Sequence, residues 1–172
     1  MNFKIDKSKS INSMLYIIHA LNERGIEAGI HKVMKLMYFA DRKHLVDYGS
    51  PITGDTYQKM KYGPVPSFAN NVANDKILER QGVINKENYV LETTKRPDMN
   101  DLSRSEVKCL DYSLENYSRY NFKELTDLSH DLAWNSSDWD IDYLLIAEEG
   151  GADKNMLNYI REQILNSNLS FC

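Results

Sequence analysis

The histidines are the side chains of this sequence best suited to hold a metal ion or to act as a general base. No two of them lie four residues apart, the spacing that places two imidazoles on one helix face and binds zinc. Ser129, His130 and Asp131 contain the residue types of a serine hydrolase site. Adjacent side chains, however, rarely point at one another. We therefore expect no metal site and no nucleophilic catalysis. The four histidines are His19, His31, His44 and His130.

The glycines and the paired acids give no stronger indication of catalysis. None of the eight glycines belongs to a dinucleotide-binding, P-loop or Gly-x-Ser-x-Gly pattern. Glu148 and Glu149 precede two glycines and are interpreted as a solvated helix end. Cys109 and Cys172 are too few for a disulfide framework, and we expect a core thiol and a thiol at a frayed end. The predicted protein is not an enzyme and carries no cofactor.

Charge is distributed unevenly along the chain, whose net charge is −4. Residues 1–63 carry ten Lys and Arg against six Asp and Glu, and residues 64–172 carry eleven against nineteen. From Asp131 to Asp153 there are seven acids and no Lys or Arg. Such a segment would repel nucleic acid, unless its acids merely cover a solvated face and helix starts. We expect nucleic acid not to be the partner.

Membrane attachment and export are also not indicated by the sequence. No run approaches the roughly 18 apolar residues that would span a bilayer. The first ten residues lack the apolar core of a signal peptide. The expected location is the cytoplasm.

The elements that position these residues are mostly helices. Residues 10–24 and 31–48 carry apolar side chains at helical spacing, with Ser10 as the expected N-cap of the first helix and a glycine ending each. Ser67 is expected to begin a third helix that runs to Arg80, with Ile77 or Leu78 facing inward. Between the second and third helices, residues 55–61 resemble a short strand. The segment Gly63–Pro66 must be extended because its two prolines fix φ.

The second half of the chain continues with a hairpin and more helices. Val83–Leu91 suggests a small β-hairpin around a polar turn. Two capping boxes, Ser103 with Glu106 and Asn121 with Glu124, predict the starts of two helices. A further helix opens at residue 152 or 153. The fold class is therefore mainly α: a compact helical domain with a small β-hairpin and short extended segments. The predicted helices of this half cover residues 103–117, 121–130 and the C-terminal segment.

The third helix and the following hairpin also fit the recognition helix and wing of a winged-helix DNA-binding regulator. Asn70, Asn71 and Asn74 offer amides that could read adenine. Asp75 and Glu79 share the same helix, and the positive charge that DNA affinity needs is missing from this half of the chain. A hairpin that closes a helical core is the favoured interpretation, and DNA binding is the alternative.

The most informative stretch lies between residues 32 and 66. Lys32–Asp41, Tyr48–Ile52 and Lys61–Pro66 together resemble the Panacea domain, found in phage-associated proteins and in SocA-like antitoxins. The matching pattern is a K-x-x-K-L-x-Y-F-A helix, a Y-G-x-P turn and a K-Y-G-P-V-P exit. Glu124–His130 and Trp134 are similar to a second landmark of that family. The resemblance implies one domain over residues 1–172, with a motif core at about 10–134 and an acidic helical extension at 135–172.

The resemblance implies a function in binding. A family member of this kind neutralises a toxic protein, encoded nearby, by direct contact. Alternatives within the same class are a mobile-element inhibitor of a host protein and an adaptor that delivers its target to proteolysis.

The motif separates expected core residues from expected contact residues. Leu36, Met37 and Ala40 belong to the buried stripe of the helix, while Lys35, Asp41 and Arg42 should lie off it. Tyrosines beside a Gly-Pro backbone form the kind of rigid patch that interfaces favour, although these rings could equally pack the hairpin onto the helix. The candidate partner-binding residues are Lys35, Tyr38, Asp41, Arg42, Tyr57, Lys61, Tyr62 and Pro64.

Overall fold

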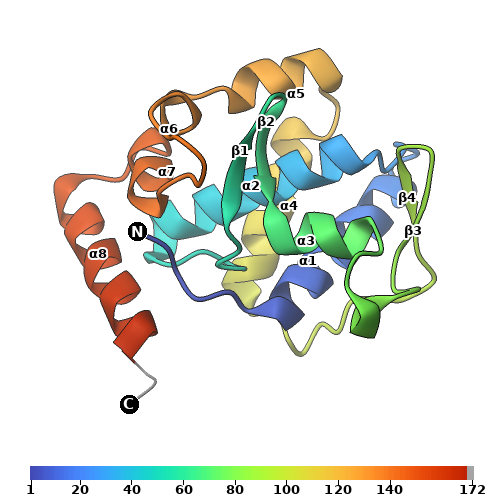
Figure 1. Ribbon diagram of the computed structural model, residues 1–172, viewed down its shortest axis with the longest axis horizontal. Coiled ribbons are helices and arrows are strands. Elements are labelled where there is room, and N and C mark those ends of the chain that lie inside the picture. Colours follow the sequence, from blue (N-terminus) through green and yellow to red (C-terminus); the bar gives the residue numbers. More distant parts are fainter. Residues whose placement is uncertain (170–172) are drawn as a thin grey trace.

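Helices dominate the fold, and small antiparallel hairpins lie against them (Figure 1). The computed structural model describes residues 1–169. Helix α2 crosses the middle of the molecule and contacts α1, α3, α4, α5, α7 and β2. The elements are α1 (Lys7–Glu23), α2 (Ile30–Tyr48), β1 (Tyr57–Met60), β2 (Gly63–Pro66), α3 (Ser67–Ala73), the 3-10 helix η1 (Leu78–Arg80), β3 (Asn85–Glu87), β4 (Val90–Glu92), α4 (Arg104–Tyr117), α5 (Phe122–Ser129), α6 (Leu132–Asn135), α7 (Tyr143–Glu149) and α8 (Lys154–Leu169).

The first two helices are confirmed, with one correction at the start of α1. Asp6 caps this helix, since its side chain accepts a hydrogen bond from the backbone N–H of Lys9. Ser10, the expected cap, is buried one turn inside the helix. Helix α2 ends where predicted, at Gly49, whose φ of 80° favours glycine.

The motif segment after α2 forms a hairpin rather than two separate extended pieces. Strands β1 and β2 pair in antiparallel register, with Tyr57 opposite Pro66 and Met60 opposite Gly63. Strand β2 packs on α2, and the turn between the strands reaches α5 (Figure 1). The two prolines are tolerated because a two-stranded ribbon has free edges.

Helix α3 is much shorter than the predicted helix, which was expected to reach Arg80. It ends at Ala73 because Asn74 bonds back to the carbonyl oxygen of Asn70 and Asp75 adopts a left-handed φ of 57°. Of the two residues offered as facing inward, Ile77 packs partly buried against the core and Leu78 is 81% exposed. A helix of two turns supplies no long recognition helix, so the winged-helix interpretation loses its main support.

The second hairpin is confirmed, although its strands are shifted from the predicted positions. The second hairpin pairs with the connection between α1 and α2 through a bridge of Val90 and Gly29. The backbone carbonyl oxygen of Tyr89 accepts a hydrogen bond from the backbone N–H of Ile30 at 2.7 Å. Leu91 donates its backbone N–H to the carbonyl oxygen of Ala28 at 2.8 Å. The hairpin is thereby held beside the start of α2.

Both predicted capping boxes are present, and they begin α4 and α5. The helix predicted from residue 152 or 153 is α8. Helices α6 and α7, which occupy the acidic segment, were not predicted as elements, although the interpretation of Glu148 and Glu149 as a helix end agrees with the end of α7 at Glu149. Asp131 and Asp142 accept backbone N–H groups at the starts of these two helices, which explains part of the acidic composition there.

The buried apolar residues among 1–169 form two clusters that share α2. The first joins α1, α2, α3 and α4. The second joins α2 with α7 and α8, and it includes Ile141, Tyr143, Ile146, Ile160 and Ile164, all at most 2% exposed. The acidic segment and α8 are therefore part of the packed fold. Asp138, Asp140 and Glu148 are exposed, whereas Asp131 and these apolar side chains are buried.

No helix within residues 1–169 is long and apolar enough to cross a membrane. The described part of the chain is mainly α, as predicted.

Candidate functional site

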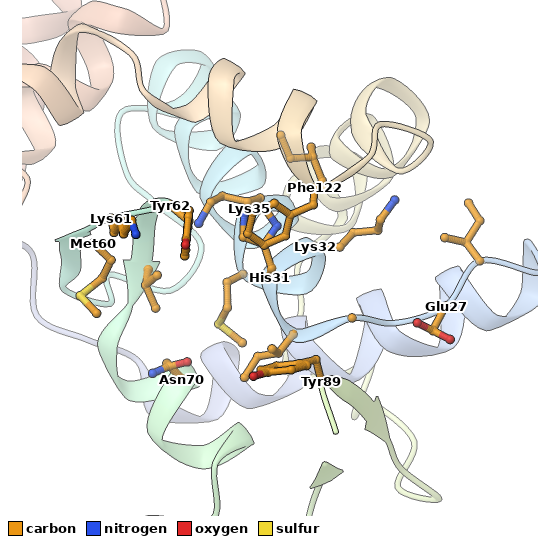
Figure 2. A pocket seen from close by; sticks show the side chains of 16 residues that line it. Glu27, His31, Lys32, Lys35, Met60, Lys61, Tyr62, Asn70, Tyr89 and Phe122 are labelled. Carbon is orange, nitrogen blue, oxygen red and sulfur yellow. The ribbon is translucent and has the colours of Figure 1, made fainter. Parts of the chain in front are cut away.

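An open groove of about 880 Å³ lies between the start of α2, the turn of the first hairpin and α5 (Figure 2). Ile30 and Met34 of α2 and Leu125 of α5 form apolar walls. Tyr89 of the second hairpin closes one end, where Figure 2 shows its ring facing the cavity. The predicted motif and its second landmark therefore supply part of the groove, and the residues before α2, the second hairpin and the start of α5 supply much of the rest.

Lys35 lies under the hairpin at the edge of this groove. Only 1% of its surface is exposed, and its Nζ donates a hydrogen bond to the carbonyl oxygen of Pro64 at 2.8 Å. Burial lowers the pKa of Lys35 to about 7, because removal from water disfavours the charged ammonium. The expectation that Lys35 lies off the buried stripe is wrong. Its amine joins α2 to β2 instead.

Gly63 permits the backbone of the first hairpin to lie this close to Lys35. Its φ is 105°, which side-chain-bearing residues rarely adopt. A β-carbon at this position would lie 2.7 Å from Cε of Lys35 and would collide with Oγ of Ser129. The Lys-Tyr-Gly-Pro motif thus needs glycine because the hairpin backbone sits directly on Lys35 and on α5.

His31 forms part of the groove wall that faces α5. Its Nε2 lies 3.1 Å from Oγ1 of Thr126, and its ring stacks on Phe122 with centroids 3.9 Å apart. Burial, followed by the nearby charge of Lys35, lowers the pKa of His31 to about 4. The imidazole is therefore neutral near pH 7 and serves as a packed polar side chain.

The hairpin turn is fixed by the second landmark of the motif. Trp134 donates its indole N–H to the carbonyl oxygen of Met60 at 3.0 Å, and Nε2 of His130 lies 3.1 Å from the carbonyl oxygen of Lys61. The two rings stack with centroids 3.9 Å apart. Since the turn carries Lys61 and Tyr62, these contacts position one wall of the groove.

Asp41 is a buried structural group, contrary to the expectation that it lies off the core stripe. Its carboxylate accepts hydrogen bonds from the backbone N–H groups of Ile52 and Thr53 and from the hydroxyls of Thr53 and Tyr57. Burial raises the pKa of Asp41, and these hydrogen bonds oppose that shift. Asp41 thus fixes the loop that leads into β1.

Tyr38 and Arg42 meet in a second buried network. The hydroxyl of Tyr38 donates to Oδ2 of Asp131 at 2.6 Å, and Nη1 of Arg42 lies 3.3 Å from the same oxygen. The guanidinium of Arg42 also lies over the ring of Phe39, 5.0 Å from its centroid. This network connects α2 to the start of α6.

The eight predicted contact residues therefore differ in their exposure and in their distance from the groove. Lys61 and Tyr62 are exposed at the groove, and Lys35 and Pro64 lie buried beneath them. Arg42 is partly exposed, but away from the groove. The remaining three, Tyr38, Asp41 and Tyr57, are buried with at most 1% exposed and cannot contact a partner directly.

Sequence reasoning missed several groove residues, including Tyr89 and Phe122. Both are aromatic and exposed, by 77% and 51%. Phe122 follows the cap residue Asn121, and an aromatic residue at the first turn of a short amphipathic helix could have drawn attention. Tyr89 carried no comparable signal, because its place at the groove depends on the bridge between Val90 and Gly29.

Metal-binding geometry is not found in the part of the chain that the structure describes: within residues 1–169, no three His, Cys, Asp or Glu side chains gather closely enough to hold an ion. Cys109 is buried there and unbonded to another cysteine, whereas Cys172 lies outside the described residues.

Comparisons with known proteins agree with the motif. The family described as antitoxin SocA-like, Panacea domain matches residues 33–135, which include α2, the first hairpin and α5. No curated protein and no solved structure matches the chain. Because the family match covers more than half of the sequence and includes both landmarks that build the groove, the chain belongs to the antitoxin SocA-like, Panacea domain family.

Proposed function

We propose that this chain is an antitoxin-type binding protein that neutralises a toxic protein partner by direct contact. The observation that carries the proposal is the open apolar groove beside the Lys61–Pro66 segment of the first hairpin, in a chain of an antitoxin-like family. Its volume of about 880 Å³ is sufficient for several partner side chains.

The composition of the groove rim supports a contact surface. Met60, Tyr62, Tyr89 and Phe122 are each between 48% and 77% exposed. Exposed aromatic and methionine side chains gathered in one patch are typical of protein interfaces. The patch also stands on rigid elements, since the turn is fixed by Trp134 and the second hairpin by the backbone of Ile30.

The polar groups of the groove are mostly engaged in holding its shape. Lys32 donates to the carbonyl oxygens of Ser118 and Tyr120 at the end of α4. His31 and Lys35 bond to Thr126 and Pro64. Such groups support a preorganised binding surface rather than a reaction, in line with a non-enzymatic role.

We further propose that the protein acts in the cytoplasm and that its partner is encoded by a neighbouring gene. Co-expression tests this. The neighbouring gene product, expressed alone, should arrest growth, and the present chain should restore growth and co-purify with that product. A neighbour that is harmless alone and does not bind the chain would contradict the proposal.

The same co-expression separates blocking from delivery to a protease. Blocking leaves the steady-state level of the toxin unchanged and gives a stable complex. Delivery lowers the toxin level in a protease-competent strain and not in a protease-deficient one. Either result is compatible with an antitoxin that binds directly.

A further inference from the structure

The groove carries positive charge in a protein that is negative overall. Among the described lining residues, Lys32, Lys35 and Lys61 are basic and Glu27 is acidic, while the whole chain has a net charge of −4. His31 is neutral near pH 7 because its pKa is lowered to about 4. The local excess of lysine therefore distinguishes the groove from the acidic surface of α6 and α7.

The three lysines differ in what they offer a partner. Lys61 is exposed at the hairpin turn, with its Nζ 5.1 Å from the centroid of the Tyr62 ring. Lys32 and Lys35 are held by carbonyl oxygens and form no ion pair within residues 1–169, although the Glu124 carboxylate interacts electrostatically with Lys32. The charge of Lys32 lies beside apolar walls, where it is screened less than in water. Lys35 adds only part of a charge near pH 7, because its pKa is lowered to about 7. The groove thus has one fully exposed lysine, Lys61, and one partly exposed lysine, Lys32, above the buried Lys35.

Apolar side chains and positive charge together define the occupant. Resting on the proposed function, we infer that the groove receives a short amphipathic segment of the protein partner, whose apolar side chains fill the cavity and whose flanking carboxylates pair with Lys61. An amphipathic segment in a hydrophobic groove is a common recognition mode, and charge complementarity favours acidic over basic flanks. Glu27, which lies on the side opposite Lys61 in Figure 2, disfavours an acid at its end of the groove and gives the segment a direction.

Site-specific photo-crosslinking in the complex with the neighbouring gene product locates the contact. A benzophenone amino acid replaces Tyr89 in one variant and Trp139 in the other. Tyr89 lines the groove, whereas Trp139 does not, and they are 77% and 84% exposed, so the two positions are matched in type and exposure. We expect a crosslink from position 89 to a partner segment with apolar residues and Asp or Glu, and none from position 139.

Charge reversal tests the pairing with Lys61. Lys61→Glu should weaken the complex by at least about tenfold at low salt, with the difference shrinking as salt screens the pair. Lys108→Glu is the control, since Lys108 is exposed on α4 away from the groove. The control should bind within about twofold of the unchanged protein, because Lys108 does not line the groove and its charge reversal changes only the distant, salt-screened field. Circular dichroism verifies that both variants fold.

The outcomes separate this inference from the proposed function. If the complex forms but Lys61→Glu binds like Lys108→Glu, or the crosslink appears at position 139 alone, the groove is not the contact and the antitoxin proposal stands. A crosslink from position 89 to a segment without carboxylates, or to a second copy of this chain, also overturns the inference. If the unchanged protein forms no complex, the proposed function fails, and the inference fails with it.

Discussion

Tyr38 donates a hydrogen bond to Oδ2 of Asp131 at 2.6 Å, although 93 residues separate them. Tyr38 belongs to the Lys32–Asp41 landmark, and Asp131 lies between His130 and Trp134 of the second landmark. The bond therefore joins the two parts of the chain that identify the family. It also brings His130 and Trp134 to the hairpin turn, where they bind the backbone of Lys61 and Met60.

Removing this hydroxyl tests how much the connection contributes to stability. Tyr38→Phe should lower the free energy of unfolding by about 1–2 kcal/mol, because a buried hydrogen bond to a carboxylate is lost while the ring stays packed. Tyr48→Phe is the control on the same helix, since Tyr48 is 41% exposed. Urea unfolding followed by circular dichroism measures both. Equal stability of the two variants would show that the bond contributes nothing.

Asp41 should be essential for folding rather than for binding. Asp41→Ala leaves four donors without their acceptor in a site that is 1% exposed, and it should cost about 3–5 kcal/mol. Asp41→Asn should cost less, about 1–2 kcal/mol, because the amide oxygen still accepts the two backbone N–H groups and the hydroxyls of Thr53 and Tyr57 are able to rotate and accept from its NH2 group. Thermal unfolding distinguishes these costs. Similar values for the two variants would contradict the assignment of the carboxylate as an acceptor hub.

Gly63 should tolerate no side chain. Gly63→Ala combines a left-handed backbone with a collision against Lys35 and Ser129, and it should destabilise the protein by about 3 kcal/mol or more. Gly82→Ala is the matched control. Gly82 has a φ of 75° with no atom near its added β-carbon, so only the backbone cost of about 1 kcal/mol remains. If both variants lose the same stability, the close packing of Lys35 on the hairpin is not significant.

The burial of Lys35 should make the stability of the protein depend on pH in an unusual way. Its pKa is about 7 in the folded protein and about 10.4 when unfolded, so between these values the unfolded chain binds more protons. The cost of burying the charge is complete below pH 7 and is relieved as pH rises. The stability of the unchanged protein relative to Lys35→Met should therefore rise by up to about 1.4 kcal/mol per pH unit between about pH 7 and 9. Urea unfolding of both proteins at pH 6, 7.5 and 9 measures this difference in the free energy of unfolding. A difference that stays constant over that range would refute the prediction.

Trp134 should affect partner binding through the hairpin turn. Trp134→Phe removes the hydrogen bond to the carbonyl oxygen of Met60 and loosens the turn that carries Lys61 and Tyr62. We expect several-fold weaker binding of the neighbouring gene product with a loss of only about 1 kcal/mol in stability. The control is Trp139→Phe, at an 84% exposed position, which should change neither quantity. Isothermal calorimetry gives the affinities. If Trp134→Phe binds with unchanged affinity, the turn is not part of the binding surface.

The C-terminal segment beyond the family match should be required for stability. Ile160 of α8 is fully buried in the second cluster, and Ile160→Ala should cost about 2–4 kcal/mol. Leu165→Ala, on the same helix but 48% exposed, should cost less than about 1 kcal/mol. Thermal unfolding compares them. A small cost at position 160 would show that α8 packs only loosely on α7.

Local signals in the sequence determined most of the helices. The capping boxes at Ser103 and Asn121 and the glycine after Tyr48 set helix ends by interactions within a few residues, so they could be predicted. Helix α3 was overestimated, because a polar run of Asn and Asp fits both a helix surface and a left-handed stop. Helices α6 and α7 were missed because each is at most seven residues long and carries little periodicity.

The sequence by itself determined the family motif, the mainly helical fold and the split of charge along the chain, since these depend on residue type and spacing. The tertiary structure alone decided which motif residues are reachable. Lys35 and Asp41 sit off the apolar stripe of an isolated helix, yet the hairpin and its leading loop cover them with backbone carbonyl and N–H groups. Burial of a polar side chain depends on partners supplied from elsewhere in the chain, and helical periodicity does not encode those partners.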